Sequence, residues 1–166
     1  MKKLISIVLI MTCFLFSTSC SLVPAYDYDD VEDILEEKRY EISDIDDGSY
    51  EGMNGFIHGV KENTEDEIYY AYFKDISSAK AFYNYVNNKQ KAKISELKME
   101  IEKIDYLLHK AEGVTAAEKG KHYEKYVELS EELDEIERYT CGRALNVVWY
   151  GTKQAIMDLR LGGQSK

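Results

Sequence analysis

Five tyrosines in the middle of the sequence have the side chains best suited to contacting a ligand. They are Tyr69, Tyr70, Tyr72, Tyr83 and Tyr85. A tyrosine ring joins an apolar face to a hydroxyl group, so exposed tyrosines could stack on sugar rings or line a groove for a peptide. The same pattern is also typical of a hydrophobic core in which strand aromatics face helix aromatics. The sequence alone leaves both interpretations open.

A second group of residues has the chemistry of a metal site. His109 and Glu112 are three residues apart, and Glu118 and His122 are four apart, so each pair would share a helix face. A turn between the two pairs would bring them to one end of a helical hairpin, where four such ligands could hold zinc. No HExxH motif and no paired cysteines accompany them. We therefore expect a polar hairpin tip rather than a metal site, and no cofactor.

Other catalytic and ligand-binding motifs fail on spacing. In the acidic stretch 44–48, counting Asp44 as first places glycine fifth and Gly55 twelfth, whereas calcium loops of the EF type need glycine sixth and glutamate twelfth. Gly120-Lys121-His122 lacks the spacing and the hydroxyl residue of a phosphate loop. His58 lies among apolar residues of an expected strand. Without a visible catalytic set, we expect a protein that is not an enzyme.

Residues 1–20 have the layout of an export signal. Lys2 and Lys3 provide a positive start, an apolar run of about 13 residues follows, and the small residues 17–19 lead to Cys20. A membrane-spanning helix needs roughly 20 apolar residues, so this run is too short to span.

The segment Phe16-Ser17-Thr18-Ser19-Cys20 resembles the lipobox of bacterial lipoprotein precursors, a family that usually has leucine where this chain has Ser17. The resemblance implies that the Cys20 thiol receives a diacylglycerol and that a signal peptidase cuts between Ser19 and Cys20. It implies export and anchoring to the outer face of the cell membrane, or to the outer membrane where the envelope has one. It covers residues 1–20 only; the alternative is an ordinary secretory signal.

On this interpretation Cys13 leaves with the signal and Cys20 is acylated. Cys141 then has no partner for an internal disulfide, and we expect it to be buried, because a free cysteine behaves as a small apolar residue.

The charge of the chain excludes some partners. The formal net charge is −10, and loss of Lys2 and Lys3 with the signal leaves −12. Such a domain is unsuited to nucleic acid, whose phosphates require lysine and arginine. It is also repelled by an anionic leaflet, so the lipid on Cys20 is the expected contact with the membrane.

After the signal (1–19) and a short tether (20–28), we expect one domain over residues 29–166. A helix begins at Asp29 or Asp30. Apolar and alternating runs predict strands at 40–43, 55–60, 68–73 and 145–150, with the second and third forming a hairpin. A long helix begins near Asp75, and a last helix turns Ala155, Ile156 and Leu159 inward.

Two apolar seams predict an antiparallel helical hairpin at about 94–139. The first seam is Ile94, Leu97, Ile101, Ile104 and Leu108, and the second is Tyr126, Leu129, Leu133 and Ile136. Both have heptad spacing. Gly113 ends the first arm, Thr115 and Glu118 form a capping box for the second, and Cys141-Gly142 ends the hairpin.

The predicted fold is α+β: a small four-stranded antiparallel or mixed sheet, helices on one face, and the hairpin inserted before the last strand. The expected function is that of a membrane-anchored envelope lipoprotein with a small non-catalytic binding domain, whose partner is another envelope protein or wall glycan. One alternative is a structural or assembly protein whose hairpin seams pair with another chain. An envelope hydrolase acting on wall material has the weakest support.

Overall fold

The computed structural model describes residues 25–44 and 50–162. The expected signal with Cys13, Ser19 and Cys20 lies outside the described residues, as does the acidic stretch 45–48. All of the helices and strands named below lie within the described ranges. No described helix is long and apolar enough to cross a membrane.

Five antiparallel strands form one sheet, so the α+β class is confirmed while the predicted strand count of four is wrong. The strands are β1 (Tyr40–Asp44), β2 (Met53–Lys61), β3 (Glu67–Phe73), β4 (Tyr139–Ala144) and β5 (Val147–Thr152). Their order across the sheet is β1-β2-β3-β5-β4, and β2 and β3 form the expected hairpin. Residues that are far apart in the sequence therefore lie next to each other on neighbouring strands.

The additional strand is β4, where the sequence predicted only the end of the helical hairpin. Cys141 pairs with Tyr150 and Gly142 with Trp149 across β4 and β5. Every residue of β4 is half-buried, so the strand has no fully buried face of the kind that a clear alternation of apolar and polar residues indicates. Cys141 is itself only half-buried, although burial raises the pKa of its thiol to about 12.

One face of the sheet is covered by the helices α2 (Tyr28–Glu37) and α5 (Lys153–Gly162). Their apolar side chains pack on inward-facing strand residues. This layer contains Val31, Ile34, Leu35, Ile57, Ile68, Tyr70, Trp149, Ala155, Ile156 and Leu159. The N-cap of α2 is Asp27 rather than Asp29 or Asp30, which instead occupy the first turn and suit the helix dipole.

The opposite face is covered by the start of α3 (Ile76–His109), so the expectation that helices cover one face is wrong. Ala71, Phe73 and Val148 pack there against Ala79 and the half-buried Phe82. Successive residues of a strand point to opposite faces. Alternate residues of β3 and β5 therefore face one layer or the other.

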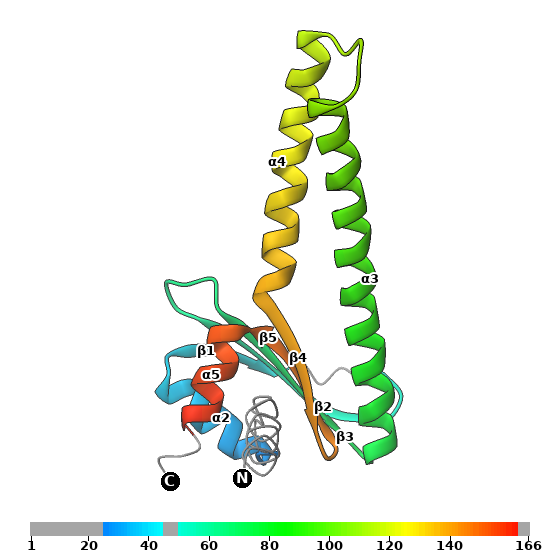
Figure 1. Cartoon of the computed structure of the whole chain (residues 1–166). Helices are drawn as coiled ribbons and strands as arrows, with labels where there is room; N and C mark the ends of the chain where they lie inside the picture. The colour runs from blue at the N-terminus through cyan, green and yellow to red at the C-terminus, as the bar shows by residue number, and fades with distance from the viewer. Residues whose placement is uncertain (1–24, 45–49, 163–166) are drawn as a thin grey trace, which may run out of the picture.

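The helices α3 and α4 (Ala116–Arg138) form the predicted hairpin, which projects from the sheet (Figure 1). Helix α3 runs without a break through 34 residues and is about 50 Å long. Leu97 and Leu129 are 2% and 3% exposed, so the two seams pack on each other. Thr115 and Glu118 form the predicted capping box, and Gly113 has the positive φ of +81° that favours glycine.

Candidate ligand cleft

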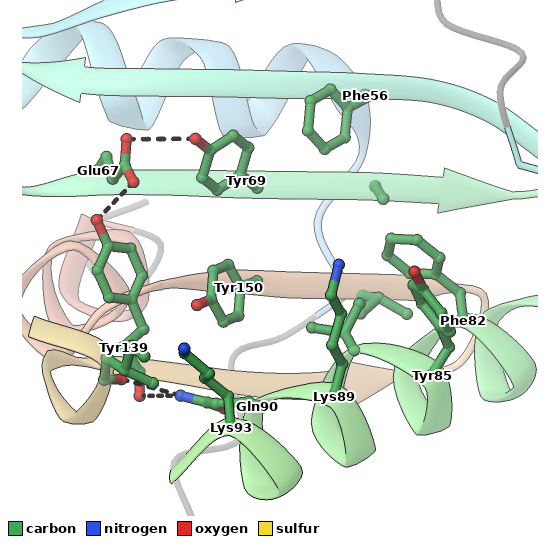
Figure 2. Close-up of a pocket in the computed structure, with 14 residues that line it drawn as sticks. Phe56, Glu67, Tyr69, Phe82, Tyr85, Lys89, Gln90, Lys93, Tyr139 and Tyr150 are labelled. Atoms are coloured by element: carbon green, nitrogen blue, oxygen red, sulfur yellow. Dashed lines mark hydrogen bonds between the residues drawn. The ribbon is translucent and has the colours of Figure 1, made fainter. Parts of the chain in front are cut away.

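A cavity of about 510 Å³ lies between the sheet and the base of the hairpin (Figure 2). Its floor is formed by residues of β2, β3 and β5, and its wall by α3 together with the end of α4 and the start of β4. The floor residues are Phe56, Tyr69, Ala71, Val148 and Tyr150. The volume falls within the range of pockets for small molecules, and such pockets are mainly apolar with a few polar groups.

A row of aromatic rings crosses the floor of the cleft. The ring centroids of Phe56 and Tyr69 are 5.6 Å apart, those of Tyr69 and Tyr150 are 6.2 Å apart, and those of Tyr150 and Tyr139 are 5.1 Å apart. The centre of the row follows from strand register, because Tyr69 and Tyr150 lie directly opposite each other on β3 and β5. Phe56 and Tyr139 contact them diagonally, since Phe56 pairs with Ala71 and Tyr139 pairs with Thr152. The floor is thus an extended apolar surface made of neighbouring aromatic rings.

Glu67 closes one end of the cleft. Its Oε1 accepts a hydrogen bond from the Tyr139 hydroxyl, and its Oε2 accepts one from Tyr69 at 3.3 Å. Oε2 also lies 3.3 Å from Nε2 of His58, whose ring stacks on Tyr69 at 4.3 Å. Burial and the hydrogen bond to Glu67 raise the pKa of Tyr139. His58 and Glu67 are therefore partners of each other and of two tyrosines.

Gln90 links the α3 part of the cleft wall to the part formed by the end of α4 and the start of β4. Its Nε2 donates to the backbone carbonyls of Ile136 and Tyr139 at 3.1 and 3.0 Å. These carbonyls lie where α4 ends and β4 begins, and the carbonyls at a helix end have no partner within the helix. The amide therefore ties the middle of α3 to the end of the hairpin.

Two lysines extend from α3 toward the rings of the sheet (Figure 2). The Lys93 ammonium is 3.0 Å from Oε1 of Glu132 on α4, and hydrogen bonding to that carboxylate raises the pKa of Lys93. The Lys89 ammonium lies 5.9 Å from the centroid of the Tyr85 ring. Lys93 is thus paired with a carboxylate, whereas Lys89 lies next to an aromatic ring.

The five tyrosines predicted as a binding surface do not form one surface. Tyr69 and Tyr85 line the cleft, and Tyr83 packs on the neighbouring core layer. Tyr70 and Tyr72 lie on the other face of the sheet, against the α2 and α5 layer, because β3 alternates its side chains. The sequence-based hypotheses of ligand surface and hydrophobic core each describe part of the group.

The tip of the hairpin does not gather its candidate metal ligands. His109 is largely exposed, with its Nδ1 3.3 Å from Oδ1 of Asp105, and Glu118 is held by Thr115 in the capping box. Glu112 lies exposed beyond the end of α3, and His122 lies within α4. Across residues 25–44 and 50–162, no group of three or more His, Cys, Asp or Glu side chains could hold a metal ion.

Several residues of the cleft were not singled out from the sequence. They are Phe56, Glu67, Phe82, Lys89, Gln90, Lys93, Tyr139 and Tyr150. Tyr150 could have been predicted to lie on the cleft face of the sheet, because it is two residues from the apolar Val148 on the same strand and side chains of a strand alternate between faces. Tyr139 belongs to the cleft only because β4 is a strand, and no strand was predicted from the sequence of that segment.

The sequence matches no protein-family model, and comparison with curated proteins and with solved structures gave no significant match.

Proposed function

We propose that this chain is a lipid-anchored envelope protein whose domain binds a small, largely apolar ligand in the cleft without reacting with it. The observation that carries the proposal is the row of rings on the floor of a 510 Å³ cavity. Aromatic faces contribute large contact areas to ligand binding. Glu67 is the one carboxylate among the residues that line this cavity, and it is engaged by Tyr69, Tyr139 and His58. That engagement favours binding over acid–base catalysis.

The anchor is proposed from the sequence of residues 16–20. A diacylated Cys20 would hold the domain at a membrane surface, since each buried CH₂ contributes about 0.8 kcal/mol. Replacing Cys20 by alanine should abolish incorporation of radiolabelled palmitate in cells. Cys13→Ala is the matched control and should leave labelling intact. Equal labelling of the Cys20→Ala variant would remove the anchor from the proposal.

Binding in the cleft can be tested with N-phenyl-1-naphthylamine, a neutral probe that fluoresces in apolar surroundings. The chain from Ser21 onward contains every described element, and its cooperative unfolding is checked first. We expect a saturable rise in fluorescence with this protein. Ala71→Leu puts a larger side chain on the cleft floor and should abolish the rise, whereas Ala117→Leu at the exposed start of α4 should preserve it.

Two outcomes would contradict the proposal of a binding cleft. One is the absence of any saturable signal with the folded parent chain. The other is equal probe affinity in the Ala71→Leu and Ala117→Leu variants when both unfold cooperatively. Tyr85→Ala provides a second test if Ala71→Leu does not fold, because Tyr85 is 54% exposed and lines the rim of the cleft.

The hairpin seams give less support to an assembly function. Leu97 and Leu129 are each buried within one chain, where α3 and α4 pack on each other, so these seams are already occupied. Sedimentation of the chain from Ser21 should give a monomer whose mass is independent of concentration. A mass that rises with concentration would instead favour pairing between chains.

A further inference from the structure

We propose that the ligand of the cleft is an amphipathic anion, with a flat apolar body on the rings of Tyr69 and Tyr150 and one acidic group at Lys89. This inference rests on the proposed function and adds the chemical class of the ligand. It is carried by three features of the described residues: the positive charge of the α3 part of the cleft wall, the surroundings of Lys89, and the engagement of the other charged side chains that line the cavity.

The α3 part of the cleft wall is basic in a chain that is otherwise acidic. Residues 76–95 of α3 include no aspartate or glutamate, although the whole chain has 31 acidic residues and a net charge of −10. The lysines of this stretch are Lys80, Lys89, Lys91 and Lys93. Two of them, Lys89 and Lys93, line the cavity. A local cluster of positive charge beside an apolar floor favours an anion more strongly than the same charges would in open water.

Lys89 is the cation best placed to receive the acidic group. Lys93 is compensated by Glu132 at 3.0 Å. Among the described residues, no carboxylate lies within ion-pair distance of Lys89, whose ammonium instead rests near the Tyr85 ring. A lysine side chain has a flexible four-carbon stem, so the ammonium can move from that ring to a ligand at the mouth of the cleft. Binding an anion would therefore supply Lys89 with the partner that Lys93 already has.

The other ligand classes that stack on aromatic rings fit less well. A cationic ligand would be attracted by the rings, but it would meet Lys89 and Lys93. A sugar needs several hydrogen-bonding groups to orient its hydroxyls. In this cavity the Glu67 carboxylate accepts from two tyrosines, and the Gln90 amide donates to two backbone carbonyls. These two groups are therefore engaged by the protein, and the Lys89 ammonium is the charged group that remains for a ligand.

Two probes with the same apolar body test the inference. 1-Anilinonaphthalene-8-sulfonate is N-phenyl-1-naphthylamine with an added sulfonate, so the ratio of their dissociation constants isolates the charge. We expect the sulfonate probe to bind about tenfold more tightly at low salt, which corresponds to about 1.4 kcal/mol. Added salt should reduce this preference while leaving the neutral probe unaffected.

Lys89→Gln should remove the preference for the sulfonate probe, measured as the ratio of the two dissociation constants within the same variant. Lys91→Gln is the matched control, because Lys91 is exposed on the same helix and does not line the cavity. Both positions are exposed, so both variants should fold. Lys93→Gln should have a smaller effect than Lys89→Gln, since Glu132 already compensates Lys93.

The outcomes separate this inference from the proposed function. Binding of the neutral probe with equal or weaker binding of the sulfonate probe would overturn the anion and leave the binding cleft standing. Displacement of the neutral probe by phenyltrimethylammonium at lower concentration than by benzoate would also overturn it, in favour of a cation. Failure of both probes to bind would contradict the two proposals together.

Discussion

The hydroxyl of Tyr139, the first residue of β4, donates a hydrogen bond to Oε1 of Glu67, the first residue of β3, across 72 positions of sequence. This bond joins the exit of the helical hairpin to the centre of the sheet. Gln90 reinforces the same junction from α3 through the carbonyl of Tyr139. The shape of the cleft therefore depends on a contact between segments that the hairpin separates.

Tyr139→Phe should lower the free energy of unfolding by about 1–2 kcal/mol, because the variant removes a hydrogen bond to a charged group and leaves Glu67 with fewer donors. At about 2–4 °C per kcal/mol, the loss is measurable by thermal unfolding. Tyr123→Phe is the control, since Tyr123 is 62% exposed. An equal and negligible effect of both substitutions would show that the Tyr139 bond does not stabilise the junction.

Buried tyrosines predict a loss of stability in alkali. Burial raises the pKa of Tyr70, which is 0% exposed. In the unfolded chain a tyrosine loses its proton near pH 10. Above about pH 10 the unfolded state therefore binds fewer protons than the folded state, and the free energy of unfolding falls as the pH rises. Below about pH 10 the contribution of Tyr70 is fully present.

Tyr70→Phe should reduce this alkaline slope by up to about 1.4 kcal/mol per pH unit. The measurement is denaturant unfolding at a series of pH values from 8 to 12. Tyr106→Phe should leave the slope unchanged, because Tyr106 is 56% exposed. Identical slopes for the two variants would contradict a protonated Tyr70 in the folded state.

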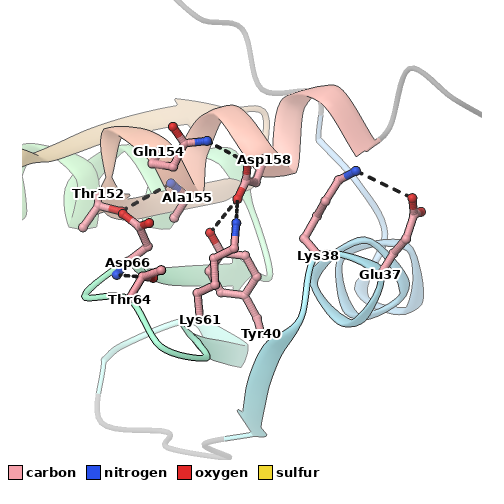
Figure 3. A network of polar contacts seen from close by, with 10 residues as sticks. All are labelled: Glu37, Lys38, Tyr40, Lys61, Thr64, Asp66, Thr152, Gln154, Ala155 and Asp158. Carbon is pink, nitrogen blue, oxygen red and sulfur yellow. Dashed lines mark hydrogen bonds and ion pairs between the residues drawn. The ribbon is translucent and has the colours of Figure 1, made fainter.

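A buried carboxylate holds β1, β2 and α5 together (Figure 3). Asp158 is 8% exposed and accepts hydrogen bonds from Lys61, Tyr40 and, at 2.9 Å, Gln154. Burial by itself would raise the pKa of this carboxyl, but the hydrogen bonds from Lys61, Gln154 and Tyr40 outweigh it and hold the pKa below its usual value. The stabilisation is therefore present above about pH 4 and is lost as the pH falls through the lowered folded pKa.

Asp158→Asn should cost about 2 kcal/mol at neutral pH. Removing one partner of a buried pair costs more than this, but the Lys61 side chain is 25% exposed and can be solvated in part. The variant should also show a smaller loss of stability in acid than the parent. Asp134→Asn on the exposed side of α4 is the control, and a matching loss in that variant would argue against a special contribution of Asp158.

Gly142 is required by the close approach of β4 to Trp149. A Cβ atom at this position would lie 2.4 Å from two atoms of the Trp149 ring, so Gly142→Ala forces strand or ring to move. We expect a loss of at least about 2 kcal/mol, a cost typical of overpacking a core. Gly120→Ala should instead stabilise α4 by about 0.5–1 kcal/mol, because a Cβ atom there meets open space in a helix. Denaturant unfolding of the two variants measures both changes in the free energy of unfolding. An unchanged free energy for Gly142→Ala would contradict the close packing of Gly142 against Trp149.

The sequence predicts the elements that local chemistry determines. Thr115 and Glu118 form the expected capping box, Asp75 caps α3 by accepting from the backbone of Ser78, and the heptad residues Leu97 and Leu129 meet in the hairpin. Each of these depends on spacings of three or four residues. The α+β class follows from such local signals.

The cleft could not be predicted in the same way, because its parts meet through strand register. Tyr69 faces Tyr150 only because β3 pairs with β5, and Tyr139 reaches Glu67 only because β4 continues directly from α4. No turn residues separate Arg138 from Tyr139, so the change from helix to strand has no glycine or proline to mark it. The alternation of side chains along β3 does predict that Tyr69 and Tyr70 lie on opposite faces of the sheet. It does not predict which of the two faces carries the cleft.

The most direct test of the binding cleft is to locate the neutral probe in it by nuclear Overhauser effects. With saturating N-phenyl-1-naphthylamine, we predict contacts from the probe to the ring of Tyr150 and the methyl groups of Val148, both on the cleft floor. Contacts instead to Met99 and Tyr106, which are exposed along α3 outside the cleft, would contradict the account.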